Sequence, residues 1–401
     1  KHVPEYEAYL LEQWSKGEFD SFWQQSGIYA LDKYHNIPDI PILFMSSWYD
    51  AYVKSTLSNY ESLRRIKKSP MTLIMGPWLH GDRNDTFSGD VDFGDEASFD
   101  NNLGNNWLDY RINWFKRCLQ ENQVDENEPT DGLKDDIKIF QMGGGSGLKN
   151  TKQRLFHGGK WLSANQWPLP NTAFYQLYLQ PGHKLSLEKP NAETASMSYV
   201  HDPDHPVPTV GGSLTSGGPI FFGGAFNQVE SKHFFGTDGS NRPLSERADV
   251  LSFETEPLSQ DISICGKVKI HLFITSDAPD TDFTAKLMDV YPASHDYPQG
   301  FAMNITDGIF RCRYRESWSK TKPLNTAEVT EITITPFETC NLFKKGHKIR
   351  LDIASSNFPK YDVNPNSGEA EGQAKSKRIA KNTIHLSQQY ASYMEIEYLD
   401  P

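Results

Sequence analysis

Two strand-length apolar runs, separated by a single amphipathic helix, constrain the fold of this chain more than any other feature. The runs span residues 40–45 and 71–75, and each has the length of a strand buried on both faces of a parallel sheet. Between them, apolar residues recur at the spacing of one helix face: Val53, Leu57, Tyr60 and Leu63. Because parallel strands need a crossover connection, residues 40–75 predict a βαβ unit.

Further patterns extend this architecture on both sides. A second helix is expected from apolar residues that share one face, namely Leu108, Ile112, Phe115 and Leu119. The run 137–140 predicts one more strand, after an acidic connection over residues 120–136. The first forty residues are rich in aromatic side chains and indicate short helices without a complete core of their own.

Beyond about residue 170 the hydrophobic period changes to two. Apolar and polar residues alternate most clearly over residues 267–274, 348–353 and 394–398. This alternation is typical of half-buried strands in an antiparallel sheet, and glycine and proline turns separate the strands. The sequence therefore predicts an α/β part followed by an all-β sandwich or jelly roll.

The charge balance restricts the partners of the chain. Asp and Glu number 52 against 40 Lys and Arg, and the net charge of −12 argues against nucleic acid or an anionic membrane as a partner. No run approaches the roughly 18–20 apolar residues of a membrane-spanning helix. His201 and His205 do not predict a metal site, because Pro203 and Pro206 exclude a helical pair of ligands.

Cysteine usage and the start of the chain bear on its cellular context. The four cysteines show no C-x-x-C spacing and predict buried thiols in place of disulfides or a zinc site: Cys118, Cys265, Cys312 and Cys340. Low cysteine content slightly favours the cytoplasm, but the localisation stays open. The chain begins at Lys1 without an initiator Met, so we expect a processed protein or a piece of a longer one.

One acidic residue and one histidine follow the two buried strands directly. Asp50 ends the segment 46–50 after the first run, and His80 lies in the segment 76–81 after the second. Ligands bind at the carboxyl ends of parallel strands, where an acid followed by a histidine fits the last two members of an α/β-hydrolase triad. The alternative is that Asp50 caps the following helix and His80 is an ordinary loop residue.

Motifs along nearly the whole chain resemble the CocE/NonD hydrolases, which are related to X-Pro dipeptidyl-peptidases and cocaine esterase. The α/β part carries IPILFMSSWYDAYVKSTLSNYESLR, GPWLHG and GDVDFG, and the β part carries DVLSFETEPLSQDISICGKVKIHLFITSDAPDTDFTAKLMDVYP, NITDGIFRCRYRE and FKKGHKIRLDIASSNFPKYDVNPNSG. The resemblance implies that Asp50 is the triad acid and His80 the triad base. It also implies three regions: the end of a helical cap (1–38), the C-terminal half of an α/β-hydrolase domain (39–165) and a jelly-roll β-sandwich (166–401).

The chain departs from the family pattern at the nucleophile, because no serine lies in a complete G-x-S-x-G elbow. Ser146 comes nearest, but it follows His80 in the chain and is expected to be a turn residue. His157 begins an H-G-G triplet that is also misplaced for an oxyanion loop. We therefore expect an upstream segment of the same protein to supply the serine, and the isolated chain to be inactive.

Aromatic residues surround the acid and the base. In similar esterases an aromatic two residues after the acid lines the acyl pocket, which makes Tyr52 a candidate pocket wall; core packing at a helix start is the alternative. Trp48 and Trp78 are further candidates for substrate contacts or for scaffold residues.

Two classes of function remain open. The first is a serine hydrolase that cleaves an ester, an amide or an X-Pro peptide through an acyl-enzyme, without a cofactor or a metal. The second is a non-catalytic β-sandwich module that binds a carbohydrate or a protein. In either class, half a parallel sheet leaves a hydrogen-bonding edge that the upstream segment or a second copy of the chain could cover.

Overall fold

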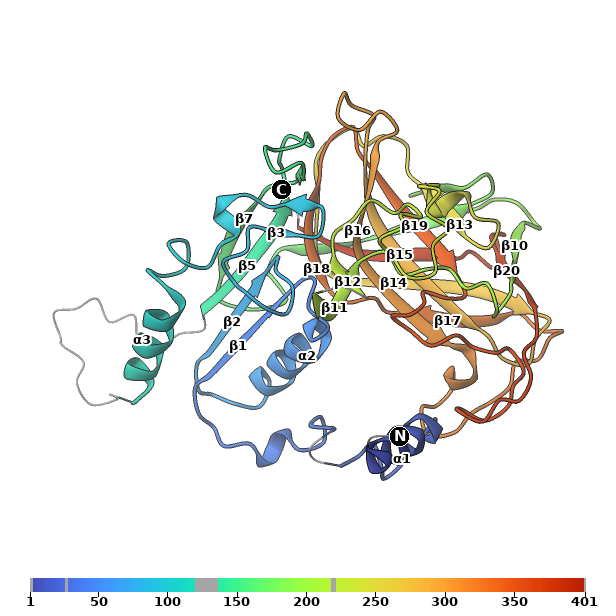
Figure 1. Cartoon of the computed structure of the whole chain (residues 1–401), viewed down its shortest axis with the longest axis horizontal. Helices are drawn as coiled ribbons and strands as arrows, with labels where there is room; N and C mark the ends of the chain where they lie inside the picture. Colours follow the sequence, from blue (N-terminus) through green and yellow to red (C-terminus); the bar gives the residue numbers. More distant parts are fainter. Residues whose placement is uncertain (1–2, 26–27, 120–135, 218–220, 400–401) are drawn as a thin grey trace.

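The computed structural model describes residues 3–25, 28–119, 136–217 and 221–399. A small layered α/β part lies beside a larger mass of β-strands, and helix α1 lies apart from the α/β sheet (Figure 1). The elements of the first part are α1 (Pro4–Ser15), β1 (Ile42–Ser47), α2 (Val53–Arg64), β2 (Met71–Gly76), β3 (Phe87–Ser88), β4 (Val91–Asp92), α3 (Trp107–Leu119), β5 (Asp136–Gly143), β6 (Leu155–Phe156) and β7 (Gly159–Ala164). No helix among the described residues is long and apolar enough to cross a membrane.

The second part consists of strands joined by loops and short 3-10 turns. Its strands are β8 (Thr172–Gln180), β9 (Lys184–Ser186), β10 (Ser196–His201), β11 (Gly212–Gly217), β12 (Phe222–Gly224), β13 (Leu251–Glu254), β14 (Ile262–Ser276), β15 (Asp282–Tyr291), β16 (Phe301–Arg311), β17 (Thr330–Ile334), β18 (Thr339–Phe343), β19 (Lys348–Ala354), β20 (Ala380–His385) and β21 (Tyr393–Leu399).

The predicted βαβ unit is present. Strands β1 and β2 pair in parallel over their whole length, and Ser47 lies opposite Gly76 at their carboxyl ends. The predicted helix face packs in the core, with Val53, Leu57, Tyr60 and Leu63 all buried. Strand β5 continues the parallel sheet on the other side of β2, whereas among the described strands β1 pairs with β2 alone.

Helix α3 covers the opposite face of this sheet from α2. Its Trp107 and Tyr110 pack with Trp78 and Phe99, while α2 belongs to the larger core. The helix was predicted correctly, but the expected apolar face is exposed: Leu108, Ile112, Phe115 and Leu119. Trp114 is the buried residue of α3, and its indole donates a hydrogen bond to Thr72 Oγ1 in β2.

The second part is a β-sandwich that shares its sheet with the α/β part. Strand β18 pairs in parallel with β5, with Asn341 opposite Met142, and it pairs antiparallel with β14. The period-two segments form β14, β19 and β21. Burial alternates along most of β14 as expected, whereas β19 is buried on both faces from Ile349 onward. The jelly-roll topology and the expected region boundaries stay predictions.

The expectation of reduced cysteines is wrong for one pair. Cys265 in β14 and Cys340 in β18 are joined by a disulfide. They lie directly opposite each other in the antiparallel pairing, although 75 residues separate them in sequence. Only the register of two distant strands brings them together, so their spacing in the sequence carried no signal. Cys312 is a buried thiol, as expected.

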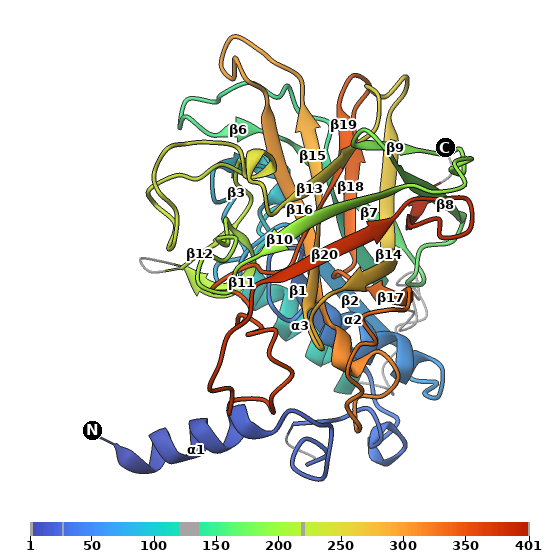
Figure 2. The ribbon, with the colours of Figure 1, turned by 90° about the vertical axis from the view of Figure 1, so that its right-hand side faces the viewer.

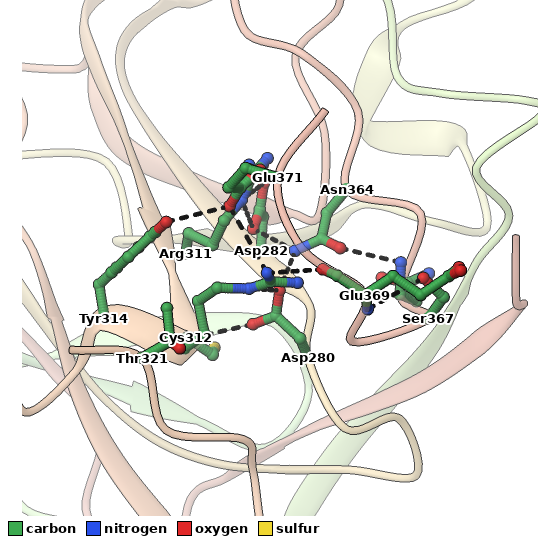
Figure 3. Close-up of polar contacts among 12 residues, drawn as sticks. Asp280, Asp282, Arg311, Cys312, Tyr314, Thr321, Asn364, Ser367, Glu369 and Glu371 are labelled. Atoms are coloured by element: carbon green, nitrogen blue, oxygen red, sulfur yellow. Dashed lines mark hydrogen bonds and ion pairs between the residues drawn. The ribbon is translucent and has the colours of Figure 1, made fainter. Parts of the chain in front are cut away.

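The loop between β19 and β20 reaches down to the N-terminal segment (Figure 2). A network around Arg311 and Arg313 holds this loop on the sandwich, and Figure 3 labels Arg311 with its partners Asp282 and Glu371. Arg311 pairs with Asp282 of β15 and with Glu371 of the loop, at 2.8 and 2.7 Å. Arg313 pairs with the fully buried Asp280 at 2.7 Å and donates to the Glu369 carbonyl.

The loop and the neighbouring chain in turn contact the segment that follows α1. A side chain added at Gly372 would meet the Trp14 carbonyl oxygen at 2.9 Å, so this position requires glycine. Nearby, the Phe19 amide donates to the Trp318 carbonyl at 2.7 Å. The arginine network therefore positions the chain that leads into the α/β sheet.

A buried chain of hydrogen bonds joins the two parts. His157, between β6 and β7, donates through Nε2 to Asn341 Oδ1 of β18 at 2.8 Å, and its Nδ1 accepts from the Tyr291 hydroxyl of β15. The Asn341 amide donates to Asp289, which also bonds His347 at 2.7 Å. Burial lowers the pKa of His157, so its ring is neutral in the folded protein.

We predict that Arg313→Met destabilises the protein, because Asp280 would lose its cationic partner inside the sandwich. Removal of one partner of a buried ion pair costs about 3–5 kcal/mol. The matched control is Lys322→Met, which removes the exposed pair with Glu316 and is expected to cost at most about 1 kcal/mol. Urea denaturation midpoints measure both; equal midpoints for the two variants would refute the proposed role of the buried pair.

We predict that His157 makes stability depend on pH. Its folded-state pKa lies below the unfolded value of about 6.5, so this contribution is complete above that pH. It is lost as the pH falls, because only the unfolded chain takes up the proton. His157→Gln should therefore flatten the fall in the urea midpoint between pH 7.5 and 5.5, whereas His295→Gln, at an exposed histidine, should not. Identical slopes in all three proteins would contradict this explanation.

Candidate active site

The parallel register of β1 and β2 brings the acid and the histidine together. Asp50 lies three residues beyond the end of β1 and His80 four beyond the end of β2. His80 Nδ1 lies 3.0 Å from Asp50 Oδ2, which is hydrogen-bonding distance. The other carboxylate oxygen accepts the Tyr52 amide at 3.0 Å, so Asp50 also orders the turn into α2.

The pair is asymmetric in its exposure. The Asp50 side chain is 9% exposed and the His80 side chain 53% exposed. Among the described residues none hydrogen-bonds His80 Nε2, so this nitrogen is available for a reacting group. A buried carboxylate on one nitrogen and an open second nitrogen are what a general base needs.

A cavity of about 320 Å³ adjoins the pair. Its lining is mostly small or polar, with a few larger side chains: Met45, Ser46, Ser47, Asp50, Tyr52, Ser55, Thr56, Trp78, Leu79, His80, Gly81 and Arg83. The cavity lies at the carboxyl ends of β1 and β2, where open parallel sheets bind their ligands.

The three candidate aromatic residues occupy different places. Tyr52 lines the cavity and is 52% exposed, and its ring meets the His80 ring edge-on at 5.3 Å. Trp78 also lines the cavity but is almost fully buried, and its indole donates to the Ala97 carbonyl. Trp48 is a scaffold residue outside the lining, because its indole donates to the Phe140 carbonyl within the core.

Other residues considered from the sequence lie away from the cavity. Ser146 is an exposed turn residue whose hydroxyl accepts the Leu148 amide, as expected. His157 is buried in the chain of hydrogen bonds between the two parts. His205 bonds Asp202 at 2.9 Å, and the described residues hold no cluster of three or more side chains able to bind a metal ion.

Sequence reasoning missed Arg83, which is the one arginine or lysine of the lining. It is half-buried, and burial together with the nearby charge of Arg111 lowers its pKa. Both guanidinium groups lie over the Trp107 ring, at 5.2 and 4.9 Å from its centre. The signal available in the sequence was its place three residues after His80, in the loop that forms the rim of the cavity.

Two family profiles match the chain. The profile of the X-Pro dipeptidyl-peptidase C-terminal non-catalytic domain matches residues 133–395. That of X-Pro dipeptidyl-peptidase, the S15 family, matches residues 1–82, which include both Asp50 and His80.

Curated relatives agree with these profiles. Cocaine esterase of Rhodococcus sp. (strain MB1 Bresler) is 30% identical over 365 residues, which cover 88% of this chain and 55% of that protein. A putative serine esterase of Mycobacterium tuberculosis (strain CDC 1551 / Oshkosh) is 25% identical over 251 residues, or 57% of this chain and 35% of the relative. The chain thus spans about half or less of the length of these relatives.

Solved structures share the fold. An aminopeptidase from a marine sediment Thaumarchaeota archaeon superposes with a TM-score of 0.75 at 24% identity, covering 98% of this chain and 60% of its own. An α-amino acid ester hydrolase superposes with a TM-score of 0.73 at 24% identity, and the match covers 99% of this chain and 62% of the hydrolase. A CocE/NonD family hydrolase of Staphylococcus aureus superposes with a TM-score of 0.57 at 14% identity, and the match covers 96% of this chain and 57% of that protein. From the profile match and the relationship to cocaine esterase, the chain belongs to the CocE/NonD and X-Pro dipeptidyl-peptidase family of serine hydrolases.

Proposed function

We propose that Asp50 and His80 are the acid and the base of a Ser-His-Asp triad that cleaves an ester or amide through an acyl-enzyme. The observation that carries this proposal is the 3.0 Å contact between His80 Nδ1 and Asp50 Oδ2 beside a cavity. His80 Nε2 takes the proton of a serine hydroxyl as that oxygen attacks the substrate carbonyl. The same nitrogen then protonates the leaving group, and Asp50 holds the ring and stabilises the imidazolium.

The nucleophile is the part of this mechanism that the chain does not supply by itself. None of its serines lies in a complete G-x-S-x-G elbow. In the triad order of α/β-hydrolases the serine precedes the acid and the histidine. We therefore place the serine, with the oxyanion donors, in a segment of the same protein upstream of residue 1.

The alternative of a non-catalytic binding module is not favoured. Such a module has no use for a buried carboxylate that orients a half-exposed histidine at the ends of two parallel strands. A wide separation of the two side chains, with His80 among apolar groups, would have supported it.

Within the enzyme class an esterase or acylase activity fits better than an X-Pro dipeptidyl-peptidase. A dipeptidyl-peptidase has to hold the free ammonium group of its substrate. The one acidic side chain in the described part of the cavity lining, Asp50, is already bonded to His80 and to the Tyr52 amide, so a dipeptidyl-peptidase would need an ammonium-binding group from the upstream segment.

We predict that Asp50→Asn lowers kcat of the full-length protein for an ester by about 10⁴-fold, because the imidazole loses the carboxylate that holds its tautomer. His80→Gln should lower kcat at least as far, since it removes the base. The matched control is Asp32→Asn, which removes an exposed carboxylate outside the cavity and should leave kcat unchanged.

Labelling with a fluorophosphonate provides the second readout. The full-length protein should form an adduct on a serine, and the isolated 401-residue chain should form none. An adduct on the isolated chain, or full activity of Asp50→Asn, would refute the assignment of roles.

We predict that Tyr52→Ala raises KM for an aromatic acyl ester by about 2- to 10-fold, the range expected for the loss of one aromatic contact. Tyr52→Phe keeps the ring beside His80 and should change KM less. An unchanged KM for Tyr52→Ala would show that the ring is not a pocket wall; Tyr9→Ala, at an exposed tyrosine of α1, serves as the control.

A further inference from the structure

The charges around the cavity select among substrates of the proposed reaction. Of the described residues that line it, Asp50 is the one acidic side chain and Arg83 the one arginine or lysine. Both oxygens of Asp50 already accept hydrogen bonds within the protein. The cavity therefore offers a substrate no uncommitted carboxylate from the described residues, but it does offer a guanidinium group.

The guanidinium of Arg83 has weak partners within the described structure. Its Nε lies 3.3 Å from Met45 Sδ, and Nη1 donates to the Gly81 carbonyl at 3.3 Å. No described carboxylate lies within the 4.0 Å of an ion pair. A guanidinium group carries five donors, so several remain for a ligand.

The surroundings of Arg83 favour an anion further. Arg111 adds a second positive charge close to the same Trp107 ring, and among the described residues it too makes no ion pair. Asp50 and Asp82 attract Arg83 from beyond ion-pair distance, yet burial and Arg111 outweigh them and lower its pKa. A half-buried arginine without an anionic partner in the protein is stabilised by a bound carboxylate, with which it can form two parallel hydrogen bonds.

We propose that Arg83 is a specificity-determining residue that binds a carboxylate group of the substrate. The proposal rests on the triad function proposed above and narrows its substrate class to esters or amides that carry an anionic group. The same charge repels an ammonium group, which argues against peptides with a free N-terminus.

Three methyl esters of similar length, which differ in their terminal charge, test the proposal on the full-length protein. They are monomethyl glutarate, methyl pentanoate and methyl 4-aminobutanoate, with hydrolysis followed by titration of the released acid. We expect kcat/KM to be highest for the anionic ester, lower for the neutral ester and lowest for the cationic ester. Arg83→Gln should lower the ratio of glutarate to pentanoate by about 10- to 100-fold, mostly through KM.

Two further variants separate charge from structure. Arg83→Lys keeps the charge but loses the planar fork, and should give an intermediate ratio. Arg65→Gln removes an exposed arginine outside the cavity and should leave all three rates unchanged. A ratio unchanged by Arg83→Gln would overturn the proposal. An equal loss of kcat/KM for all three esters would leave this ratio unchanged as well, and would indicate a structural role for Arg83.

Calorimetric binding of glutarate gives a readout that does not depend on turnover. The wild-type protein should bind glutarate at least tenfold more tightly than Arg83→Gln, and equal affinities would overturn the proposal. Hydrolysis of methyl pentanoate that requires His80, without any preference for glutarate, would refute the role of Arg83 alone. The absence of all hydrolysis and of a fluorophosphonate adduct would instead refute the proposed function, and the glutarate titration would still decide the role of Arg83.

Discussion

The parallel pairing of β1 with β2 is the constraint on which the candidate site depends. Because the two strands run in the same direction and end at the same level, with Ser47 opposite Gly76, the residues just beyond them share one edge of the sheet. A single hydrogen bond of 3.0 Å then joins Asp50 to His80. The pleated alternation of the two strands divides their packing between the face covered by α2 and the face covered by α3.

The β-sandwich is joined to the sheet that carries Asp50 and His80 by backbone pairing and by buried hydrogen bonds. Strand β5 extends the parallel sheet and pairs with β18, so both parts of the chain share continuous backbone hydrogen bonds. The neutral His157 joins the same two parts through Asn341 and Tyr291. The arginine network holds the loop between β19 and β20 on the sandwich (Figure 3), and this loop contacts the chain after α1 at Gly372. The sandwich therefore orients both the beginning and the end of the α/β part.

Local periodicity predicted much of this architecture, and long-range pairing accounts for what it missed. The helical stripe of α2, the buried runs of β1 and β2 and the alternation in β14 are visible within short windows. The disulfide of Cys265 with Cys340 and the pairing of β5 with β18 depend on the register of distant strands, which no short window contains. The apolar stripe of α3 predicted a helix but not which face packs, because three aromatic residues decide the packing. Arg83 was missed because a single loop arginine belongs to no periodic pattern. Its place in the cavity lining is visible only in the folded structure.

The position of the nucleophile relative to His80 tests the account most directly. In a crystal structure of the uninhibited full-length protein, the Oγ of the serine that reacts with a fluorophosphonate should lie about 2.6–3.2 Å from His80 Nε2. The contact of Nδ1 with Asp50 should be retained in the same crystal. A reactive serine outside hydrogen-bonding reach of His80, or a different acidic partner for its ring, would contradict the assignment of this pair as the acid and base of the enzyme.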